Sequence, residues 1–200
     1  MSRLFSTWYD TLMGPLERRS FKRIRINLLS KASGKVLELG SGTGINFPLY
    51  HSLESVTAIE PSTYMIEKSI QKKQKSLIPI EIVHASAERL PFPDNTFDTV
   101  IGTLVFCTIP NVEKAIEEMK RVCKPEGRIL LFEHVRMGNS ILAHLQDWLT
   151  PFWKKICDGC CLNRNTVQVL KENGLEIVQL ETYFKDLFVV AELIKQDKIY

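Results

Sequence analysis

Three glycines at alternate positions follow a short apolar stretch near the start of the chain. Gly40, Gly42 and Gly44 come directly after residues 36–39, a run that contains one carboxylate, Glu38. An apolar run of this length followed by glycines is typical of a buried strand that leads into a ligand-binding turn. Glycine suits such a turn because it adopts positive φ angles and has no Cβ to keep a ligand at a distance. The pattern predicts a nucleotide-type ligand at the carboxyl end of a parallel strand.

The spacing of the glycines distinguishes between classes of nucleotide ligand. Dinucleotide-binding loops follow G-x-G-x-x-G and face the pyrophosphate with a helix N-terminus. Here the third glycine comes one residue early, Ile45 takes the dinucleotide position, and Pro48 hinders a helix from starting inside the loop. The loop instead suits a ligand with adenosine at one end and an amino acid at the other, such as S-adenosylmethionine. A structural turn without a ligand is the alternative.

An acidic residue twenty positions after Gly40 supports the nucleotide interpretation. Glu60 ends a second apolar run, residues 56–59. A βαβ unit places at this offset the acid that accepts hydrogen bonds from the ribose hydroxyls. Pro61 then suits the first turn of a helix. A surface glutamate is the alternative, but an acid at the end of an apolar strand favours ribose binding.

The elements that must position these residues follow an α/β pattern. The alternation of apolar runs with helical segments predicts a Rossmann-like, doubly wound sheet of seven strands, mostly parallel with an antiparallel terminal strand, and helices on both faces. Residues 1–31 are basic and aromatic and predict an amphipathic helical arm or lid. Residues 32–200 form the rest of a single domain. In the arm, the basic side chains are interpreted as a solvated face that also suits an anionic lipid surface.

Composition excludes several classes of protein. A net charge of +3 is too small to indicate a nucleic-acid partner, and no apolar run approaches the roughly 18 residues of a membrane span. Without a signal-peptide core, a cytoplasmic location is expected. The five cysteines are an odd number without a disulfide framework, so reduced thiols are expected. Cys157, Cys160 and Cys161 resemble half of a zinc site, but no second Cys or His pair stands at a partner spacing, so buried packing is favoured and no metal is predicted.

Five segments of the chain resemble, in order and spacing, the class I S-adenosylmethionine-dependent methyltransferases. They are residues 36–44, 60–62, 87–92, 97–100 and 124–127. The resemblance is to the type 11 branch, which includes quinone C-methyltransferases and phospholipid N-methyltransferases. A finer likeness is to animal alkyl-thiol methyltransferase-like proteins and to bacterial relatives labelled phospholipid methyltransferases. It rests on residues 42–47, 103–107, 132–135 and 158–164.

Two features depart from these families. Residues 1–31 are too polar for the membrane anchor of the animal proteins. Ser86 also stands where many class I relatives have an aspartate that binds the adenine amine.

The resemblance implies S-adenosylmethionine as cofactor and S-adenosylhomocysteine as product. It assigns Glu38 and the glycines to the methionine end, Glu60 to the ribose, Met65 to packing on adenine, and Ser86 with Ala87 to the adenine edge. The full set predicted to bind the cofactor is Glu38, Gly40, Ser41, Gly42, Gly44, Glu60, Pro61, Met65, Ser86, Ala87, Glu88 and Thr103. The acceptor pocket is predicted to include Tyr9, Phe106 and Cys107.

The acceptor decides whether the enzyme needs a base. Direct transfer from a sulfonium needs no metal, because the leaving thioether is neutral. A thiol is already a few per cent ionised at neutral pH, whereas a phenol or activated carbon benefits from a positioned base. His134 is the candidate base, with Glu133 orienting it or binding the acceptor; a structural histidine is the alternative. Thiol, phospholipid amine and quinone-like acceptors all fit. A non-catalytic cofactor-binding module is the alternative function.

Overall fold

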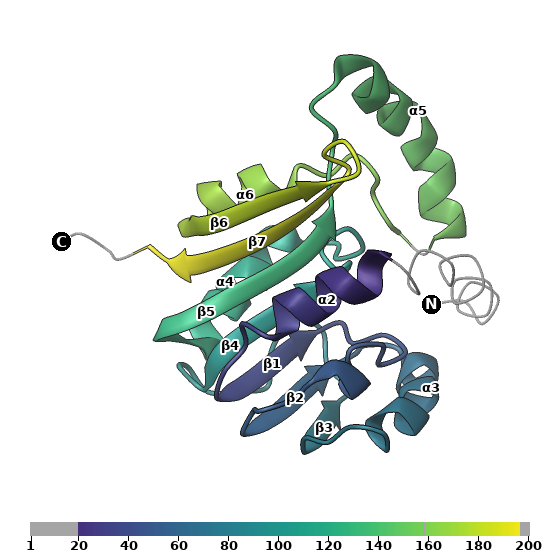
Figure 1. The fold of residues 1–200 in the computed structure, drawn as a ribbon. Coiled ribbons are helices and arrows are strands. Elements are labelled where there is room, and N and C mark those ends of the chain that lie inside the picture. Colours follow the sequence, from purple (N-terminus) through teal and green to yellow (C-terminus); the bar gives the residue numbers. More distant parts are fainter. Residues whose placement is uncertain (1–19, 158, 197–200) are drawn as a thin grey trace.

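The strands form one sheet with helices on both faces. The computed structural model describes residues 20–157 and 159–196, and within this part seven strands pair in the order β3-β2-β1-β4-β5-β7-β6 (Figure 1). Strands β1 to β5 pair in parallel, whereas β7 lies between β5 and β6 and is antiparallel to both. The strands are β1 Lys35–Leu39, β2 Ser55–Ile59, β3 Ile80–Val83, β4 Phe97–Thr103, β5 Cys123–His134, β6 Leu175–Tyr183 and β7 Phe188–Lys195. The fold class predicted from the sequence is confirmed.

Helices begin where short polar side chains cap their first turns. The Ser62 hydroxyl accepts a hydrogen bond from the Met65 amide, and the Asn111 amide oxygen accepts one from Lys114. Such caps satisfy donors that an isolated helix end leaves open. The helices are α2 Lys22–Leu29, the 3-10 turn η2 Phe47–Leu49, α3 Thr63–Lys73, α4 Val112–Val122, α5 Ser140–Ile156 and α6 Thr166–Glu172.

Two apolar layers hold the sheet between the helices. Side chains alternate between the faces of a strand, so Leu37 of β1 packs with α4 and α6, whereas Val36 packs with α2 and η2. Phe21, just before α2, is fully buried against Phe132 of β5, with ring centroids 5.2 Å apart. Helix α2 therefore belongs to the core of the domain. The rest of the predicted arm, residues 1–19 with Tyr9, lies outside the described part of the chain.

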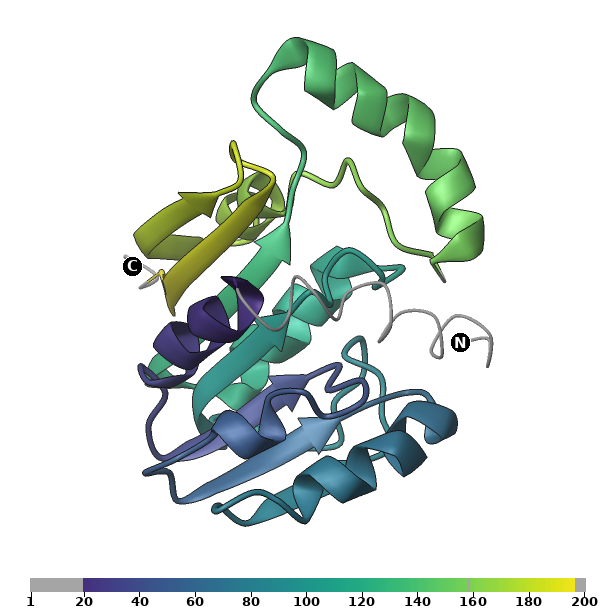
Figure 2. The same cartoon turned by 45° about the vertical axis from the view of Figure 1, so that its right-hand side comes forward.

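Helix α5 stands away from the sheet, as the turned view makes plain (Figure 2). Gln146 anchors it, since its amide nitrogen donates to the carbonyls of Val135 and Leu162 and its amide oxygen accepts from the Met137 amide. Its outer face exposes several large apolar side chains: Ile141, Leu145, Trp148, Phe152 and Ile156. Within the described residues, no helix combines the length and the apolar character that crossing a membrane requires.

One segment continues as a strand although its composition is typical of a turn. Residues 124–127 include Pro125 and Gly127, but they lie inside β5. Pairing with β4 jumps there, from Phe97 opposite Cys123 to Thr99 opposite Arg128. The extra residues on β5 form an irregularity of the β-bulge kind, in which a strand bends without ending.

Candidate active site

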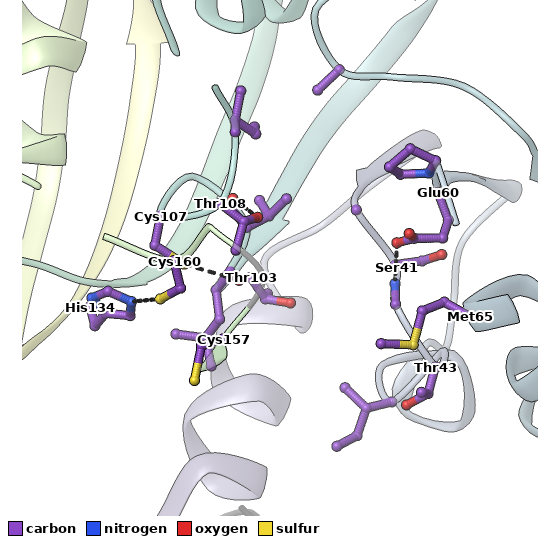
Figure 3. A pocket seen from close by; sticks show the side chains of 18 of the residues that line it. Ser41, Thr43, Glu60, Met65, Thr103, Cys107, Thr108, His134, Cys157 and Cys160 are labelled. Carbon is purple, nitrogen blue, oxygen red and sulfur yellow. Dashed lines mark hydrogen bonds between the residues drawn. The ribbon is translucent and has the colours of Figure 1, made fainter. Parts of the chain in front are cut away.

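A cavity of about 540 Å³ opens at the carboxyl ends of the central strands. The loops after β1, β2, β3 and β4 reach it, as does His134 at the end of β5, as expected for a ligand site in an open α/β sheet. The labelled side chains fall into two groups (Figure 3). Ser41, Glu60 and Met65 lie on one side, the cofactor end. Cys107 and His134 lie on the other, the acceptor end, together with Cys157 and Cys160.

The glycine loop turns tightly beneath the cofactor end. Gly42 has a φ of +54°, and a Cβ built on it would meet no atom within 4 Å, so this glycine faces open space in the cavity. Gly40 is constrained differently, because its Cβ would collide with Val105. The hydroxyl oxygen of Ser41 is buried in the cavity wall without a hydrogen-bond partner among the described residues. Buried polar atoms are usually hydrogen-bonded, so this hydroxyl is available to a polar ligand group in the cavity.

Glu60 holds the glycine loop and faces the same cavity. Its carboxylate accepts hydrogen bonds from the amides of Gly42 and Ser62, both at 2.9 Å. Burial raises the pKa of Glu60, although these two amides act in the opposite direction. Each carboxylate oxygen has further acceptor capacity, so both can accept hydroxyl donors from a ligand in the cavity.

The loop after β3 forms the far wall of the cofactor end. Ser86, Ala87 and Glu88 all line the cavity, together with the buried side chain of Met65. The Ser86 hydroxyl donates to Glu88 at 3.1 Å, and the other carboxylate oxygen of Glu88 accepts from the Asn111 amide at 2.8 Å. This loop is therefore fixed to the start of α4 before any ligand binds.

A buried arginine that the sequence analysis assigned to the solvated face of the arm lines the cavity instead. Arg25 of α2 is only 3% exposed. Its guanidinium donates to the side-chain oxygens of Asn46 at 3.0 Å and Thr103 at 2.8 Å. The spacing contained a signal for this placement, because Arg25 lies four residues after Phe21 and three before Leu28, on the buried stripe of the helix.

Glu38 lies behind this network and does not line the cavity. Its two carboxylate oxygens accept from Asn46 at 2.7 Å and from the Tyr50 hydroxyl at 2.9 Å. Burial raises the pKa of Glu38 to about 7, against the effect of these hydrogen bonds. The predicted direct contact with the cofactor does not fit this position, since Glu38 instead orients Asn46, whose amide oxygen accepts from Arg25. Gly44 likewise packs on Phe47 outside the cavity lining.

The acceptor end brings sulfur and imidazole groups together. His134 Nε2 lies 3.2 Å from the Cys160 sulfur. Cys107, Cys157 and Cys160 pack against one another, with Trp153 beside them. The Cys107 thiol and the His134 ring both lower the pKa of Cys160, although burial opposes them. Burial also opposes a charge on His134, but the Cys160 sulfur outweighs it and raises the pKa of the ring.

Glu133 has a different position from the one predicted. It is buried, and one of its oxygens accepts from the amides of Val105 and Phe106 at 2.8 and 3.0 Å. The other oxygen and His134 Nδ1 have no hydrogen-bond partner among the described residues. Glu133 thus fixes the loop after β4 and neither orients the imidazole by a hydrogen bond nor lines the cavity. Phe106 is also corrected, because it is fully buried in the core beneath α4.

The structure thus gathers most of the predicted site and adds to it. Ser41, Pro61, Thr103 and Cys107 line the cavity as expected, together with Gly40 and His134. The sequence analysis missed several lining residues that come from distant parts of the chain: Arg25, Cys157, Cys160, Leu162, Phe184, Leu187 and Phe188.

Comparison with known proteins identifies the family of the chain. Residues 37–131 match the family described as "Methyltransferase domain". Human thiol S-methyltransferase TMT1B is 31% identical over 193 residues, which cover 89% of this chain and 79% of the human protein. Phosphatidylethanolamine N-methyltransferase of Cereibacter sphaeroides is 32% identical over 156 residues, which cover 76% of each.

A solved structure has the same fold. The S-adenosylmethionine-dependent methyltransferase of Thermotoga maritima, described as a possible histamine N-methyltransferase, superposes with a TM-score of 0.68 over 95% of each chain. The two sequences are 20% identical, so this likeness concerns the fold alone.

Proposed function

Because the chain belongs to the S-adenosylmethionine-dependent methyltransferases, as the resemblance of its motifs predicted, we propose that it methylates a small lipophilic thiol. The methyl donor is S-adenosylmethionine. The thiol occupies the acceptor end of the cavity, between the donor and the group formed by Cys107, His134 and Cys160.

The described residues fit this donor at the cofactor end. Glu60 is placed to accept hydrogen bonds from ribose hydroxyls, and the buried Ser41 hydroxyl supplies a polar contact beside it. The open space above Gly42 lets the ligand approach the backbone. Arg25 is the cation that lines this part of the cavity, so it is the group that would hold the carboxylate of the amino-acid moiety.

The observation that supports a thiol is the distribution of charge along the cavity wall. Among the described lining residues the carboxylates are Glu60 and Glu88, both at the cofactor end. The acceptor end is formed by apolar side chains, sulfur and one imidazole, with Trp153, Leu162 and Phe188 among them. Such a wall offers no counter-charge to an ammonium-type acceptor, whereas a lipophilic thiol loses little on leaving water.

The chain's own residues then act mainly by position. The bound donor supplies an electrophilic methyl group on a sulfonium. A thiol near its ordinary pKa is a few per cent thiolate at neutral pH, so holding the sulfur in line at about 3–3.5 Å is the main requirement. Glu133 keeps the loop of Cys107 in place, and the apolar wall excludes water that would compete for the acceptor site.

The test is transfer of a deuterated methyl group from S-adenosylmethionine to a panel of acceptors, followed by mass spectrometry. The panel holds an alkyl thiol, the alcohol of the same chain length, phosphatidylethanolamine and a demethylated quinone. We expect a methylated thiol and an unchanged alcohol. A product from the amine or the quinone but not from the thiol would contradict the proposal, and the absence of any product would favour the non-catalytic module.

A further inference from the structure

Three side chains that commonly bind metal ions converge at the acceptor end. Cys107, His134 and Cys160 each offer one donor atom, and these three atoms lie within 4.8 Å of one another. All three residues are buried, and they come from the loop after β4, the end of β5 and the loop after α5 (Figure 3). The sequence analysis looked for a partner pair close to Cys160 along the chain, whereas the fold supplies the partners from other strands.

The separations are close to those around a tetrahedral zinc ion. Zinc binds sulfur at about 2.3 Å and imidazole nitrogen at about 2.0–2.1 Å, so its ligand atoms lie roughly 3.5–3.8 Å apart. The His134 nitrogen and the Cys160 sulfur are 3.2 Å apart, and the group as a whole spans at most 4.8 Å. Side-chain movements of up to about 1 Å therefore bring the three atoms to binding distances.

The backbone that carries the three ligands is already fixed. Glu133 accepts from the amides of Val105 and Phe106, just before Cys107. The Cys161 amide donates to the Cys107 carbonyl at 2.9 Å. The Arg164 guanidinium donates to the carbonyls of Phe106 and Ile109. These contacts join the loop after α5 to the loop after β4, which gives the donor atoms the support that a metal site needs.

Three protein ligands leave the fourth tetrahedral position open, and that position faces the cavity, because Cys107, His134 and Cys160 all line it. Zinc held by two cysteines and one histidine with an open position is an arrangement found in catalytic sites. We propose that these three residues bind a zinc ion whose fourth ligand is the sulfur of the acceptor thiol. The ion site stands on the geometry alone, whereas the identity of the fourth ligand rests on the proposed function.

The chemistry of this step balances without an oxidant or reductant. The thiol proton passes to solvent when the sulfur binds zinc, since a metal-bound thiol is deprotonated. A lone pair of that sulfur forms the bond to the methyl carbon. The bond between this carbon and the sulfonium sulfur breaks, and its electron pair stays on the sulfur of the cofactor, which becomes a neutral thioether. The zinc ion keeps its oxidation state.

Metal content tests the site directly. The full chain, purified without a polyhistidine tag or chelator, is analysed by inductively coupled plasma mass spectrometry. We expect about one zinc ion per chain. Cys107→Ser, Cys160→Ser and His134→Ala should each lose most of the zinc. Two matched controls should keep it: Cys161→Ser, next to a ligand, and Cys123→Ser, at a buried cysteine elsewhere. Calorimetric binding of S-adenosylhomocysteine shows that each variant is folded.

Three results would overturn the zinc inference. One is wild-type protein that carries no zinc and keeps none after reconstitution and dialysis. Another is zinc content that does not change in the three ligand variants. A third is loss of zinc in Cys157→Ser, since it would make the site a closed one with four protein ligands.

The open position has its own test. Cobalt(II) replaces zinc in the wild-type protein, and the thiolate-to-metal charge-transfer band is recorded. Adding an alkyl thiol should change this spectrum, and adding the alcohol of the same chain length should not. An unchanged spectrum would overturn the assignment of the fourth ligand.

These experiments separate the two proposals. Thiol methylation by zinc-free protein would contradict the assignment of the acceptor thiol as fourth zinc ligand and leave the proposed function in place. Zinc-loaded protein that methylates no thiol would contradict the proposed function and leave the ion site in place.

Discussion

The two ends of the cavity are built in different ways. At the cofactor end, most polar contacts come from loops that directly follow β1, β2 and β3, with Arg25 of α2 added to them. Backbone amides take part, since the Glu60 carboxylate accepts from the amides of Gly42 and Ser62. At the acceptor end, side chains from β5, α5 and the hairpin of β6 and β7 meet around sulfur atoms. The first end depends on backbone conformation and the second on the packing of distant segments.

This difference has a functional consequence. The shape of the cofactor end follows from the strand order of the sheet, so it changes little when side chains elsewhere change. The acceptor end can be altered by substitutions in α5 or the terminal hairpin that leave the glycine loop untouched. Related methyltransferases can therefore differ in acceptor, as the names of the human and bacterial relatives illustrate.

The largest expected effect is a loss of cofactor affinity caused by a substitution at the cofactor end alone. Glu60→Ala should weaken binding of S-adenosylhomocysteine at least about 100-fold, because two hydrogen bonds to a charged group contribute roughly 1.5–3 kcal/mol each. Isothermal titration calorimetry measures this change. Glu81→Ala, at an exposed position on β3, is the matched control. Equal affinities of Glu60→Ala and the wild type would remove Glu60 from the ribose site.

The second prediction concerns Glu38, which is buried behind the cofactor end and should lower the free energy of unfolding when it is ionised. The pKa of Glu38 is about 7 in the folded protein, against an ordinary value of 4.5. Because this pKa is raised on folding, the protonated carboxyl stabilises the folded protein fully at a pH below the pKa of the unfolded chain. That stabilisation is lost as the pH rises through the pKa of the folded protein. Between about pH 4 and pH 8, the unfolding free energy of the wild type should fall by about 3 kcal/mol relative to that of Glu38→Gln.

Urea unfolding of both proteins over this pH range measures the difference. The exposed variant Glu81→Gln should follow the wild type at every pH. Parallel curves for Glu38→Gln and the wild type would mean that Glu38 titrates alike in the folded and unfolded chains, and the predicted cost would be wrong.

The third prediction tests whether Arg25 binds the amino-acid moiety of the cofactor, by comparing a ligand that has this moiety with one that lacks it. Arg25→Met should weaken binding of S-adenosylhomocysteine about 10- to 100-fold and that of 5′-methylthioadenosine, which lacks the amino-acid moiety, by less than about twofold. Arg23→Met, at an exposed position of the same helix, is the control. If calorimetry finds equal losses for both ligands, Arg25 shapes the loop through Asn46 and Thr103 and does not bind the carboxylate.

The cofactor end could be predicted from the sequence because its determinants lie close together along the chain. The glycine spacing and the distance of twenty positions from Gly40 to Glu60 both lie within one βαβ unit, so residue type and position together indicate the site. Apolar periodicity predicted the strands in the same way, since it reflects which face of each element is buried. The misplacement of Arg25 has a physical reason: charged helix residues are usually solvated, and only the stripe it shares with Phe21 and Leu28 indicates otherwise.

The acceptor end could not be predicted to the same extent. Cys107 and Cys160 meet only because the loop after α5 returns to the loop after β4, where Cys161 and Cys107 share a backbone hydrogen bond. No local pattern specifies that return. Glu133 and Phe106 were misplaced for a related reason, because each has a sequence neighbour that lines the cavity. The Phe106 side chain itself lies in the core, and the Glu133 carboxylate is used up on the backbone of the loop after β4.

The segment that matches the methyltransferase family does not contain all the residues that form the cavity. A protein trimmed to residues 37–131, the span that matches the methyltransferase family, would keep Glu60 and Cys107 but lack Arg25, His134 and Cys160. It would also lack β7, which covers the edge of β5, and so would leave an open sheet edge prone to aggregation. Any transplant of this activity into another scaffold should therefore carry α2 and the terminal hairpin along with the signature region.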